Sequence, residues 1–314
     1  MSKTRWTGKA PLIVILGATA TGKTGLAMQL AESLDGEIVG ADSRQIYRGM
    51  DIGTAKPNAE QRARVRHHLV DIADPDENPG LATIQAQANA AIADIQRHGR
   101  VPLLVGGTGQ YLSAIVEGWS IPEVPPNEAL RAELEGYARR QGSMALHRRL
   151  ADVDPVTAAR THPNNVRRVV RSLEVWQATG QAISMQQGRH PPPWDVLQLG
   201  LQLERAALYA RADRRLEAMI QAGFVGEVHG LLQAGFSRDL PSMSGLGYRQ
   251  LSAHLLDGLP LPEAIASAKT ATHDFIRRQL TWFRGHHANI RWLDAASLDA
   301  QPIAEDLRRW LAMT

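Results

Sequence analysis

Eight consecutive residues near the start of the chain fit the pattern of a phosphate-binding loop, G-x-x-x-x-G-K-[ST]. They are Gly17, Ala18, Thr19, Ala20, Thr21, Gly22, Lys23 and Thr24, called the P-loop below. In such a loop, backbone N–H groups and the start of the following helix bind phosphate oxygens. Lys23 adds a positive charge, and the Thr24 hydroxyl can hold Mg²⁺. The pattern therefore predicts a site for a phosphorylated ligand.

The residues around the P-loop have the patterns of a buried strand and a helix. Residues 12–16 form a continuous apolar run that ends at Gly17, and residues 24–34 have a helical pattern. Further strands are indicated at 37–41, 101–105 and 196–203, with a helix over 82–98. Strands that alternate with helices through short links predict an α/β core with a parallel sheet.

Ligands of a parallel sheet bind beyond the carboxyl ends of its strands, where the chain places small and acidic residues. The run 101–105 is followed by Gly106-Gly107-Thr108-Gly109, without the Asp that organises Mg²⁺ and water in a P-loop NTPase. Asp42 instead follows the run 37–41. These strand ends predict a bound phosphorylated group, but they do not predict hydrolysis of a nucleoside triphosphate.

The sequence changes character after Gly118. Pro122, Pro125 and Pro126 mark a linker, and the residues over 127–150 and 166–178 have helical patterns. A second linker spans 186–194, and the chain from Glu204 on is mostly helical in pattern. We therefore expect a core of residues 1–118 plus 194–314, interrupted by a helical insertion domain at 119–193.

The basic residues are mostly arginine, with 30 Arg and 5 Lys. Arg holds phosphate through a flat bidentate fork that Lys lacks, although codon bias in a GC-rich genome would give the same composition. Residues 1–130 carry 12 basic against 14 acidic side chains, while residues 131–290 carry 20 against 14. This asymmetry favours an anionic partner for the second part of the chain.

Composition excludes several classes of protein. The 314-residue chain has no cysteine, which excludes disulfide scaffolds, cysteine-ligated zinc and thiolate catalysis. No apolar run approaches the roughly 20 residues of a membrane helix. The polar, basic start of the chain and the short apolar run behind it do not fit a signal peptide. We therefore expect a cytoplasmic protein with no membrane partner.

Residues 42–57, Asp-Ser-Arg-Gln-Ile-Tyr-Arg-Gly-Met-Asp-Ile-Gly-Thr-Ala-Lys-Pro, resemble the characteristic segment of tRNA dimethylallyltransferases. These enzymes are also called tRNA isopentenyltransferases, or the IPP transferase family. The resemblance continues at 67–71, 106–109, 163–180, 247–251 and 278–284, and covers residues 11–293 in the family's order. Ala18 and Thr21 stand where the family usually has Pro and Ser, and neither change removes a required group.

The resemblance implies a P-loop NTPase-like fold and a prenyl transfer. The family moves the dimethylallyl group of dimethylallyl diphosphate to the exocyclic N6 of adenosine 37, beside the tRNA anticodon, and diphosphate leaves. The P-loop would then bind a prenyl diphosphate together with Mg²⁺, and this use explains the missing Asp after residues 101–105. The implied partners are dimethylallyl diphosphate and the anticodon stem-loop of tRNA, and we expect a monomer.

The resemblance also implies roles in catalysis. Asp42 matches the family's base for the N6 proton, while Lys23 and the P-loop N–H groups would stabilise the leaving diphosphate. Arg211 and Arg215, four residues apart and so on one face of a predicted helix, match a pair of family arginines. The alternative role for Asp42 is to organise Mg²⁺. The alternative for the two arginines is a solvated basic face without a catalytic role.

For tRNA binding, the resemblance points to the residues after the second strand, to the insertion and to the C-terminal helices. They are Asp42, Ser43, Arg44, Gln45, Thr108, Arg131, Arg167, Arg168, Arg171, Gly247, Tyr248, Arg249, Arg278, Gln279, Trp282 and Arg284. The alternative for each arginine among them is that it is an ordinary surface residue that does not contact tRNA. His67 and His68 point apart if they lie on a strand, which favours a structural role over a metal site.

Three other functions remain open at this point. One is a small-molecule enzyme of the same superfamily that prenylates free AMP or ADP, against which the arginine-rich insertion argues. Another is a P-loop kinase for a small metabolite. A third is a tRNA-binding protein without catalysis, against which the joint presence of Lys23, Thr24 and Asp42 argues.

Overall fold

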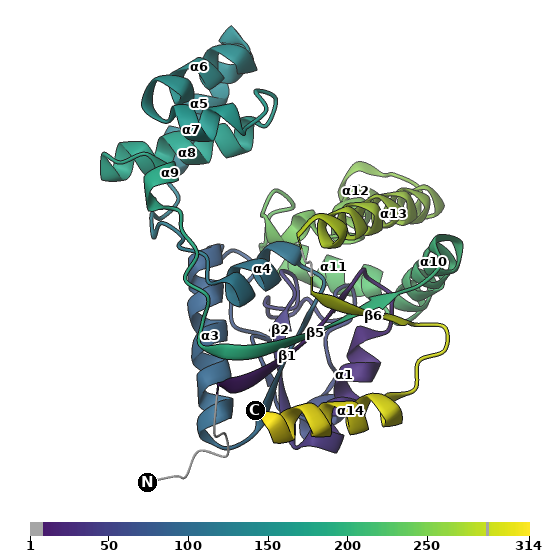
Figure 1. Ribbon diagram of the computed structural model, residues 1–314. Coiled ribbons are helices and arrows are strands. Elements are labelled where there is room, and N and C mark those ends of the chain that lie inside the picture. Colours follow the sequence, from purple (N-terminus) through teal and green to yellow (C-terminus); the bar gives the residue numbers. More distant parts are fainter. Residues whose placement is uncertain (1–8, 287–288) are drawn as a thin grey trace. The chain divides into compact units, whose positions relative to one another are not determined.

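The computed structural model describes residues 9–286 and 289–314, and it divides into two compact units. The larger unit contains the chain up to Pro79, Thr83–Val116 and Pro193–Thr314. The smaller unit contains Gly80–Ala82 and Glu117–Pro192. The larger unit is built around a sheet, whereas the smaller one is helical (Figure 1).

The sheet of the larger unit has six strands, and every pair of neighbours is parallel. Its order is β3 (His67–His68), β2 (Gly36–Ala41), β4 (Val101–Gly106), β1 (Ala10–Gly17), β5 (Trp194–Gln202) and β6 (Ile290–Asp294). The predicted α/β class and the strands expected at 12–16, 37–41, 101–105 and 196–203 are confirmed.

Strand β6 was not predicted from the sequence, which was expected to be mostly helical there. It is five residues long, and Arg291, Trp292 and Asp294 are exposed, so no apolar alternation marks it. Its pairing with β5, in which Trp292 lies opposite Gly200, defines the strand. Long-range pairing of this kind leaves little trace in the local sequence.

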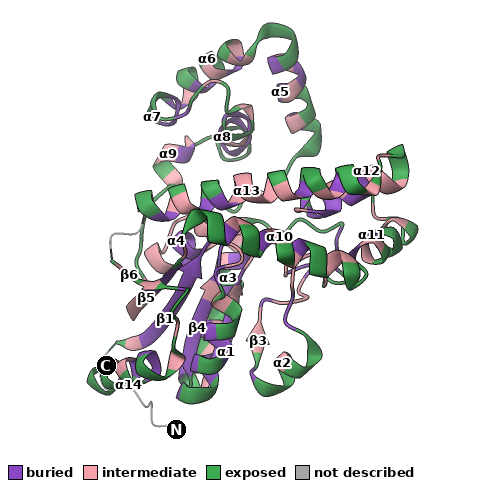
Figure 2. Ribbon diagram, turned by 90° about the vertical axis from the view of Figure 1, so that its right-hand side faces the viewer, coloured by how far each residue is buried: buried purple, intermediate pink, exposed green. Residues whose placement is uncertain are grey.

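Strand β1 is buried on both faces, since residues 12–16 have no exposed surface. Leu12 and Leu16 belong to one hydrophobic cluster and Ile13 to the other, because successive side chains of a strand point to opposite faces. Helix α3 (Leu81–Arg97) packs in the first cluster, and α1 (Lys23–Leu34) and α14 (Ala300–Met313) pack in the second. Figure 2 shows the resulting buried strands between helices with exposed outer faces.

The remaining helices of the sheet-containing unit follow the strands in chain order. They are α2 (Ala59–Arg64), α4 (Gly109–Glu117), α10 (Arg205–Gln221), α11 (Phe224–Gln233), α12 (Tyr248–Asp257) and α13 (Leu261–His286), with a short 3₁₀ turn at Ser242–Ser244. The helical character expected after Glu204 is present apart from β6. Helices α10 and α13 contact each other and bring widely separated residues to the ends of the strands.

The smaller unit has a hydrophobic core of its own, to which Leu130, Leu146 and Val169 contribute. Its helices are α5 (Glu128–Gln141), α6 (Ser143–Val153), α7 (Pro155–Ala159), α8 (Val166–Thr179) and α9 (Ile183–Gln186). The helical pattern expected over 127–150 is confirmed, but it is divided between two helices, because Gly142 has φ 86° and separates α5 from α6. A positive φ cannot continue an α-helix, and glycine adopts it at little cost.

Gly106 offers a test of how closely the central strands approach each other. A Cβ at this position would lie 2.0 Å from the Ala41 carbonyl oxygen on β2. We expect Gly106→Ala to lower the free energy of unfolding by about 2 kcal/mol or more, because the backbone of β2 must move. The control Gly226→Ala, in exposed helix with nothing within 4 Å, should raise it by about 0.5–1 kcal/mol. Urea denaturation of both variants measures this difference, and equal shifts would contradict the close strand packing.

Candidate active site

A cavity of about 280 Å³ opens at the carboxyl ends of β1, β2 and β4. Its walls come from the P-loop, from the segments after β2 and β4, and from helices α10 and α13. The lining residues are Thr19, Ala20, Asp42, Ser43, Arg44, Gly53, Thr54, Thr108, Ala212, Arg215, Leu216, Met219, Phe224, Ser244, Gly245, Leu246, Tyr248, Thr272, Phe275, Arg278 and Gln279. The predicted strand ends therefore do meet around one space.

The P-loop is a tight turn in which two side chains bond to the same backbone carbonyl. The Lys23 ammonium and the Thr21 hydroxyl each donate a hydrogen bond to the Ala18 carbonyl, both at 2.8 Å. Gly22, which precedes α1, has φ 98°, and Ala20 has φ 64°. The loop thus needs a left-handed backbone at an alanine, a conformation that the surrounding contacts must maintain.

Lys23 lies in a partly desolvated position beside other charges. Burial lowers the pKa of Lys23 to about 8, Arg215 contributes in the same direction, and the nearby Asp42 carboxylate opposes the shift. Within the described residues, Lys23 forms no ion pair. Its charge is therefore available to an anion that binds to the P-loop. Thr24 is exposed in the first turn of α1 and does not line the cavity.

Asp42 is held by the backbone that follows it. Its Oδ1 accepts hydrogen bonds from the N–H groups of Arg44 at 2.8 Å and Gln45 at 3.4 Å. The second oxygen, Oδ2, accepts no hydrogen bond from the described part of the chain. The N–H of Ser43 donates to the Thr108 hydroxyl at 3.2 Å, so Thr108 lies next to Asp42. The carboxylate is thus oriented and retains one free acceptor oxygen.

Of the two arginines expected on α10, only Arg215 lines the cavity. Its side chain is partly buried, and burial lowers the pKa of Arg215 while Asp42 raises it. Arg211 is exposed and is not among the lining residues. The four-residue spacing places both arginines on one side of α10, but about one helical turn apart. Residues one turn apart need not both reach the same cavity.

The polar groups of Arg44 and Gln45 donate hydrogen bonds mostly to backbone carbonyl oxygens. The Arg44 guanidinium donates to the carbonyl oxygens of Pro241 and Ser242 and to the Ser244 hydroxyl. The Gln45 amide donates to two carbonyl oxygens of the same loop, those of residues 54 and 55, each at 3.1 Å. Arg44 still lines the cavity, whereas Gln45 does not.

Glu227 on α11 contributes to the site, although the sequence alone did not indicate it. Its carboxylate accepts the N–H groups of Asp51, Ile52 and Gly53 at 2.8, 2.6 and 3.1 Å, and the Tyr248 hydroxyl at 2.5 Å. Burial and the Glu227 charge raise the pKa of Tyr248 far above its usual range. Glu227 thereby fixes the cavity wall formed by Gly53 and Tyr248. A single acidic residue in an amphipathic helix gives no signal for this role.

Comparison with known proteins decides which family has this arrangement. A family model described as IPP transferase matches residues 45–286. The chain belongs to the IPP transferase family. A tRNA dimethylallyltransferase of Roseiflexus sp. (strain RS-1) is 53% identical over 96% of this chain and 99% of its own length. One of Chloroflexus aurantiacus (strain ATCC 29366 / DSM 635 / J-10-fl) is 56% identical over 87% of this chain and 92% of its own.

Solved structures of the IPP transferase family have the same fold. The full-length tRNA isopentenylpyrophosphate transferase of Bacillus halodurans aligns with a TM-score of 0.70 at 39% identity, over 97% of this chain and 96% of its own. A eukaryotic dimethylallyltransferase, crystallised acting on tRNA, aligns with a TM-score of 0.80 at 28% identity. That alignment covers 96% of this chain and 78% of the eukaryotic one.

The four insertion-domain arginines that were expected to bind tRNA fall into two groups. Arg131 and Arg171 both form ion pairs with the buried Glu174, at 2.8 and 2.5 Å, so their charges are used inside the smaller unit. Arg167 and Arg168 are exposed on α8 and pair with no acidic group in the described residues. Only the second pair presents free guanidinium groups to solvent.

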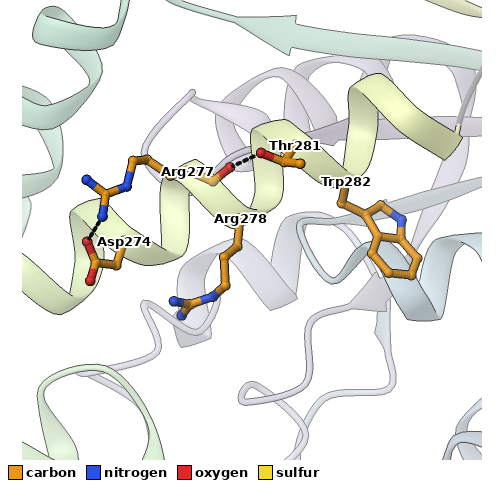
Figure 3. Close-up of a pocket in the computed structure, with 5 residues that line it drawn as sticks. All are labelled: Asp274, Arg277, Arg278, Thr281 and Trp282. Carbon is orange, nitrogen blue, oxygen red and sulfur yellow. Dashed lines mark hydrogen bonds and ion pairs between the residues drawn. The ribbon is translucent and has the colours of Figure 1, made fainter. Parts of the chain in front are cut away.

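Two of the expected α13 residues, Arg278 and Trp282, line a second hollow of about 380 Å³, together with Asp274, Arg277 and Thr281 (Figure 3). Arg277 pairs with Asp274, whereas Arg278 has no ion-pair partner in the described chain and lines both cavities. Outside these cavities, Arg249 and Arg284 are exposed.

Gln279 and Gly247 are both buried, and Gln279 also lines the first cavity. The Gln279 amide is buried and bonds to backbone at the P-loop and at Gly107. Gly247 has φ 83°, and a Cβ there would lie 2.4 Å from the Phe224 ring. No residue larger than glycine fits this position without displacing the ring.

The two histidines of β3 have structural partners. His68 Nε2 lies 2.6 Å from the buried Glu37 carboxylate, and His67 Nδ1 lies 2.7 Å from the Val65 carbonyl oxygen. In the described residues, no group of three or more His, Cys, Asp or Glu side chains is arranged to hold a metal ion. No helix among those same residues is long and apolar enough to cross a membrane.

The lowered pKa of Lys23 predicts a pH dependence for anion binding. Below about pH 8 the ammonium is charged, and above it the charge is lost, so affinity should fall as pH rises. We expect the dissociation constant of inorganic pyrophosphate, measured by calorimetry, to rise by up to about tenfold per pH unit above this value. In Lys23→Arg the guanidinium stays charged, and comparison with this variant removes the ligand's own titration. The same profile in both proteins would assign the effect to another group.

Proposed function

We propose that this chain transfers the dimethylallyl group of dimethylallyl diphosphate to N6 of adenosine 37 in tRNA and releases diphosphate. The observation that carries the proposal is the cavity itself, which joins P-loop residues to Asp42 in one space. Asp42 has a free acceptor oxygen, and β4 ends in Gly106 without an NTPase aspartate. Membership of the IPP transferase family and the names of its relatives support the same reaction.

The diphosphate end of the substrate meets the positive side of the cavity. Thr19, Ala20 and Arg215 line the cavity, whereas Lys23 does not line it but is electrostatically coupled to Asp42 and Arg215. We propose that the P-loop N–H groups, Lys23 and Arg215 stabilise the charge that grows as the allylic C–O bond breaks. Neither cation has an ion-pair partner in the described structure, so each is free to stabilise the leaving group. Arg211 would act only at the rim, because it does not line the cavity.

Mg²⁺ fits the P-loop as a partner of the diphosphate. Thr24 offers one exposed hydroxyl, and no cluster of three acidic or histidine ligands accompanies it in the described residues. An ion held there would take its other ligands from the diphosphate and water, as Mg²⁺ commonly does. When bound, it supplies further neutralisation of the diphosphate charge.

The nucleophile is the adenine N6, whose lone pair forms a bond to the first carbon of the dimethylallyl group. The C–O bond electrons leave with the diphosphate, and the N6 proton passes to the free oxygen of Asp42. Thr108, beside Asp42, lies within the same wall and can orient the amine. The apolar side chains of Leu216, Met219 and Phe224 offer a dry surface for the dimethylallyl group.

The tRNA would present adenosine 37 from the single-stranded anticodon loop, where a base can be splayed into a protein cavity. The proposed phosphate contacts are the exposed arginines at 167, 168, 249, 278 and 284, for which the described residues offer no ion-pair partner. We propose that the protein acts in this way as a monomer in the cytoplasm.

The reaction is tested with labelled dimethylallyl diphosphate, Mg²⁺ and two possible acceptors, unmodified tRNA with adenosines at positions 36–38 and free AMP. A third reaction contains ATP and neither acceptor, and its ATP consumption is measured. We expect label on tRNA alone. Label on AMP alone would indicate a small-molecule prenyltransferase, and ATP consumption without label would indicate a kinase, so either outcome contradicts the proposal.

Asp42→Asn tests the proposed base. Asparagine keeps an oxygen for the N–H groups of residues 44 and 45 but cannot accept the N6 proton. We expect the transfer rate to fall by about 100-fold or more, while the tRNA dissociation constant changes less than about twofold. Asp257→Asn, at an exposed ion pair with Arg238, is the control and should leave the rate unchanged. A normal rate in Asp42→Asn would show that another group takes the proton.

Arg168→Ala tests the proposed phosphate contacts. Because each neutralised phosphate contributes to counterion release, the slope of log affinity against log salt should become shallower by about 0.7–0.9. Arg97→Ala removes an exposed arginine that pairs with Asp94 on α3 and should leave the slope unchanged. Filter binding across a salt series gives both slopes. An unchanged slope for Arg168→Ala would remove this residue from the tRNA interface.

A further inference from the structure

One side chain ties three elements of the active site together. Gln279, on α13, is only 6% exposed. Its Oε1 accepts the N–H of Thr19 in the P-loop at 2.9 Å, and its Nε2 donates to the Gly107 carbonyl at 2.8 Å. Both ends of the amide are thus used, one on the phosphate-binding loop and the other on the segment that follows β4.

The two anchored segments belong to opposite sides of the proposed reaction. Thr19 precedes Ala20, whose left-handed backbone at φ 64° is a conformation that needs outside support. Gly107 precedes Thr108, whose hydroxyl accepts the N–H of Ser43 beside Asp42. The Gln279 amide therefore sets the distance between the loop for the diphosphate and the residues around the proposed base.

The Gln279 amide is tightly packed against Gly107. A Cβ at Gly107 would lie 2.5 Å from Gln279 Nε2, 3.2 Å from the Gly17 carbonyl oxygen and 3.6 Å from Lys23 Nζ. Gly107 is thus surrounded by the Gln279 amide, the start of the P-loop and Lys23. A displacement of Gln279 would therefore also change the position of Lys23.

We infer that Gln279 is a positioning residue for the prenyl diphosphate and not a tRNA contact. It holds the P-loop in its anion-binding conformation and in register with Asp42. The neighbouring Arg278 lines the same cavity, but it is exposed, has no ion-pair partner in the described chain and also lines the second hollow. This inference rests on the proposed function, because it assigns Gln279 to one of that reaction's two substrates.

The test compares Gln279→Met and Gln279→Glu with the wild-type protein. Methionine has a similar length and loses both hydrogen bonds, whereas glutamate keeps an acceptor for Thr19 but loses the donor to Gly107 and adds negative charge. Gln96→Met is the matched control, since Gln96 is also buried and its amide donates to the Pro11 carbonyl at 2.9 Å, at the other end of β1.

We expect Gln279→Met to raise the KM for dimethylallyl diphosphate by about tenfold or more, because displaced active-site groups lose much of their effect. Gln279→Glu should raise it further, since its carboxylate repels the diphosphate. The KM and dissociation constant for tRNA should stay within about twofold in both, and Gln96→Met should change none of these values. A tenfold weaker tRNA affinity with an unchanged diphosphate KM would overturn the inference, and so would unchanged kinetics.

Calorimetric binding of inorganic pyrophosphate separates this inference from the proposed reaction. If the wild-type protein transfers no label to tRNA, the proposed function fails, but weaker pyrophosphate binding by the variants still supports the role of Gln279. If the wild type is active and the variants bind pyrophosphate normally, only the inference about Gln279 fails. Loss of the folded state in both variants, seen by circular dichroism, would also overturn it, because Gln279 would then serve general stability.

Discussion

Fixed positive charge without a protein counterion is the constraint on which the site depends. Lys23 and Arg215 lie in partly buried positions that lower their pKa values, and neither pairs with an acidic side chain in the described residues. Asp42 is the carboxylate that opposes both shifts, and its Oδ1 is committed to backbone N–H groups. Buried charge of this kind costs free energy in the empty protein and becomes favourable when an anion arrives.

The rest of the larger unit keeps those charges in place with charges that are paired. Lys56 is buried against Asp51 and Asp71, and so it holds the loop after β2. Glu227 accepts three successive N–H groups of the same loop and a tyrosine hydroxyl. The chain thus contains two kinds of ionic group. Around the cavity, Lys56 and Glu227 have partners and hold the loop after β2, whereas Arg215 and Arg278 pair with no acidic side chain in the described residues and line the cavity, where an anionic substrate can reach them.

The sequence predicts the elements better than it predicts which side chains they bring together. The P-loop pattern, the apolar run 12–16 and the strand ends at Asp42 and Gly106 identified the α/β fold and the edge of the sheet that has the cavity. Local pattern does not reveal whether an arginine has a partner. Arg131 and Arg168 both lie in helical segments of the insertion, yet the first pairs with a glutamate 43 residues away, while the second forms no ion pair with any described residue. Strand β6 and the role of Glu227 likewise depend on contacts between distant residues.

A crystal structure of the protein with a non-reactive thio analogue of dimethylallyl diphosphate tests the central claim most directly. The account predicts the diphosphate against the P-loop N–H groups, within reach of Lys23 and Arg215. The dimethylallyl carbon that reacts should face the free oxygen of Asp42. A structure in which the analogue lies away from the P-loop, while a nucleoside triphosphate occupies the loop under the same conditions, would contradict it.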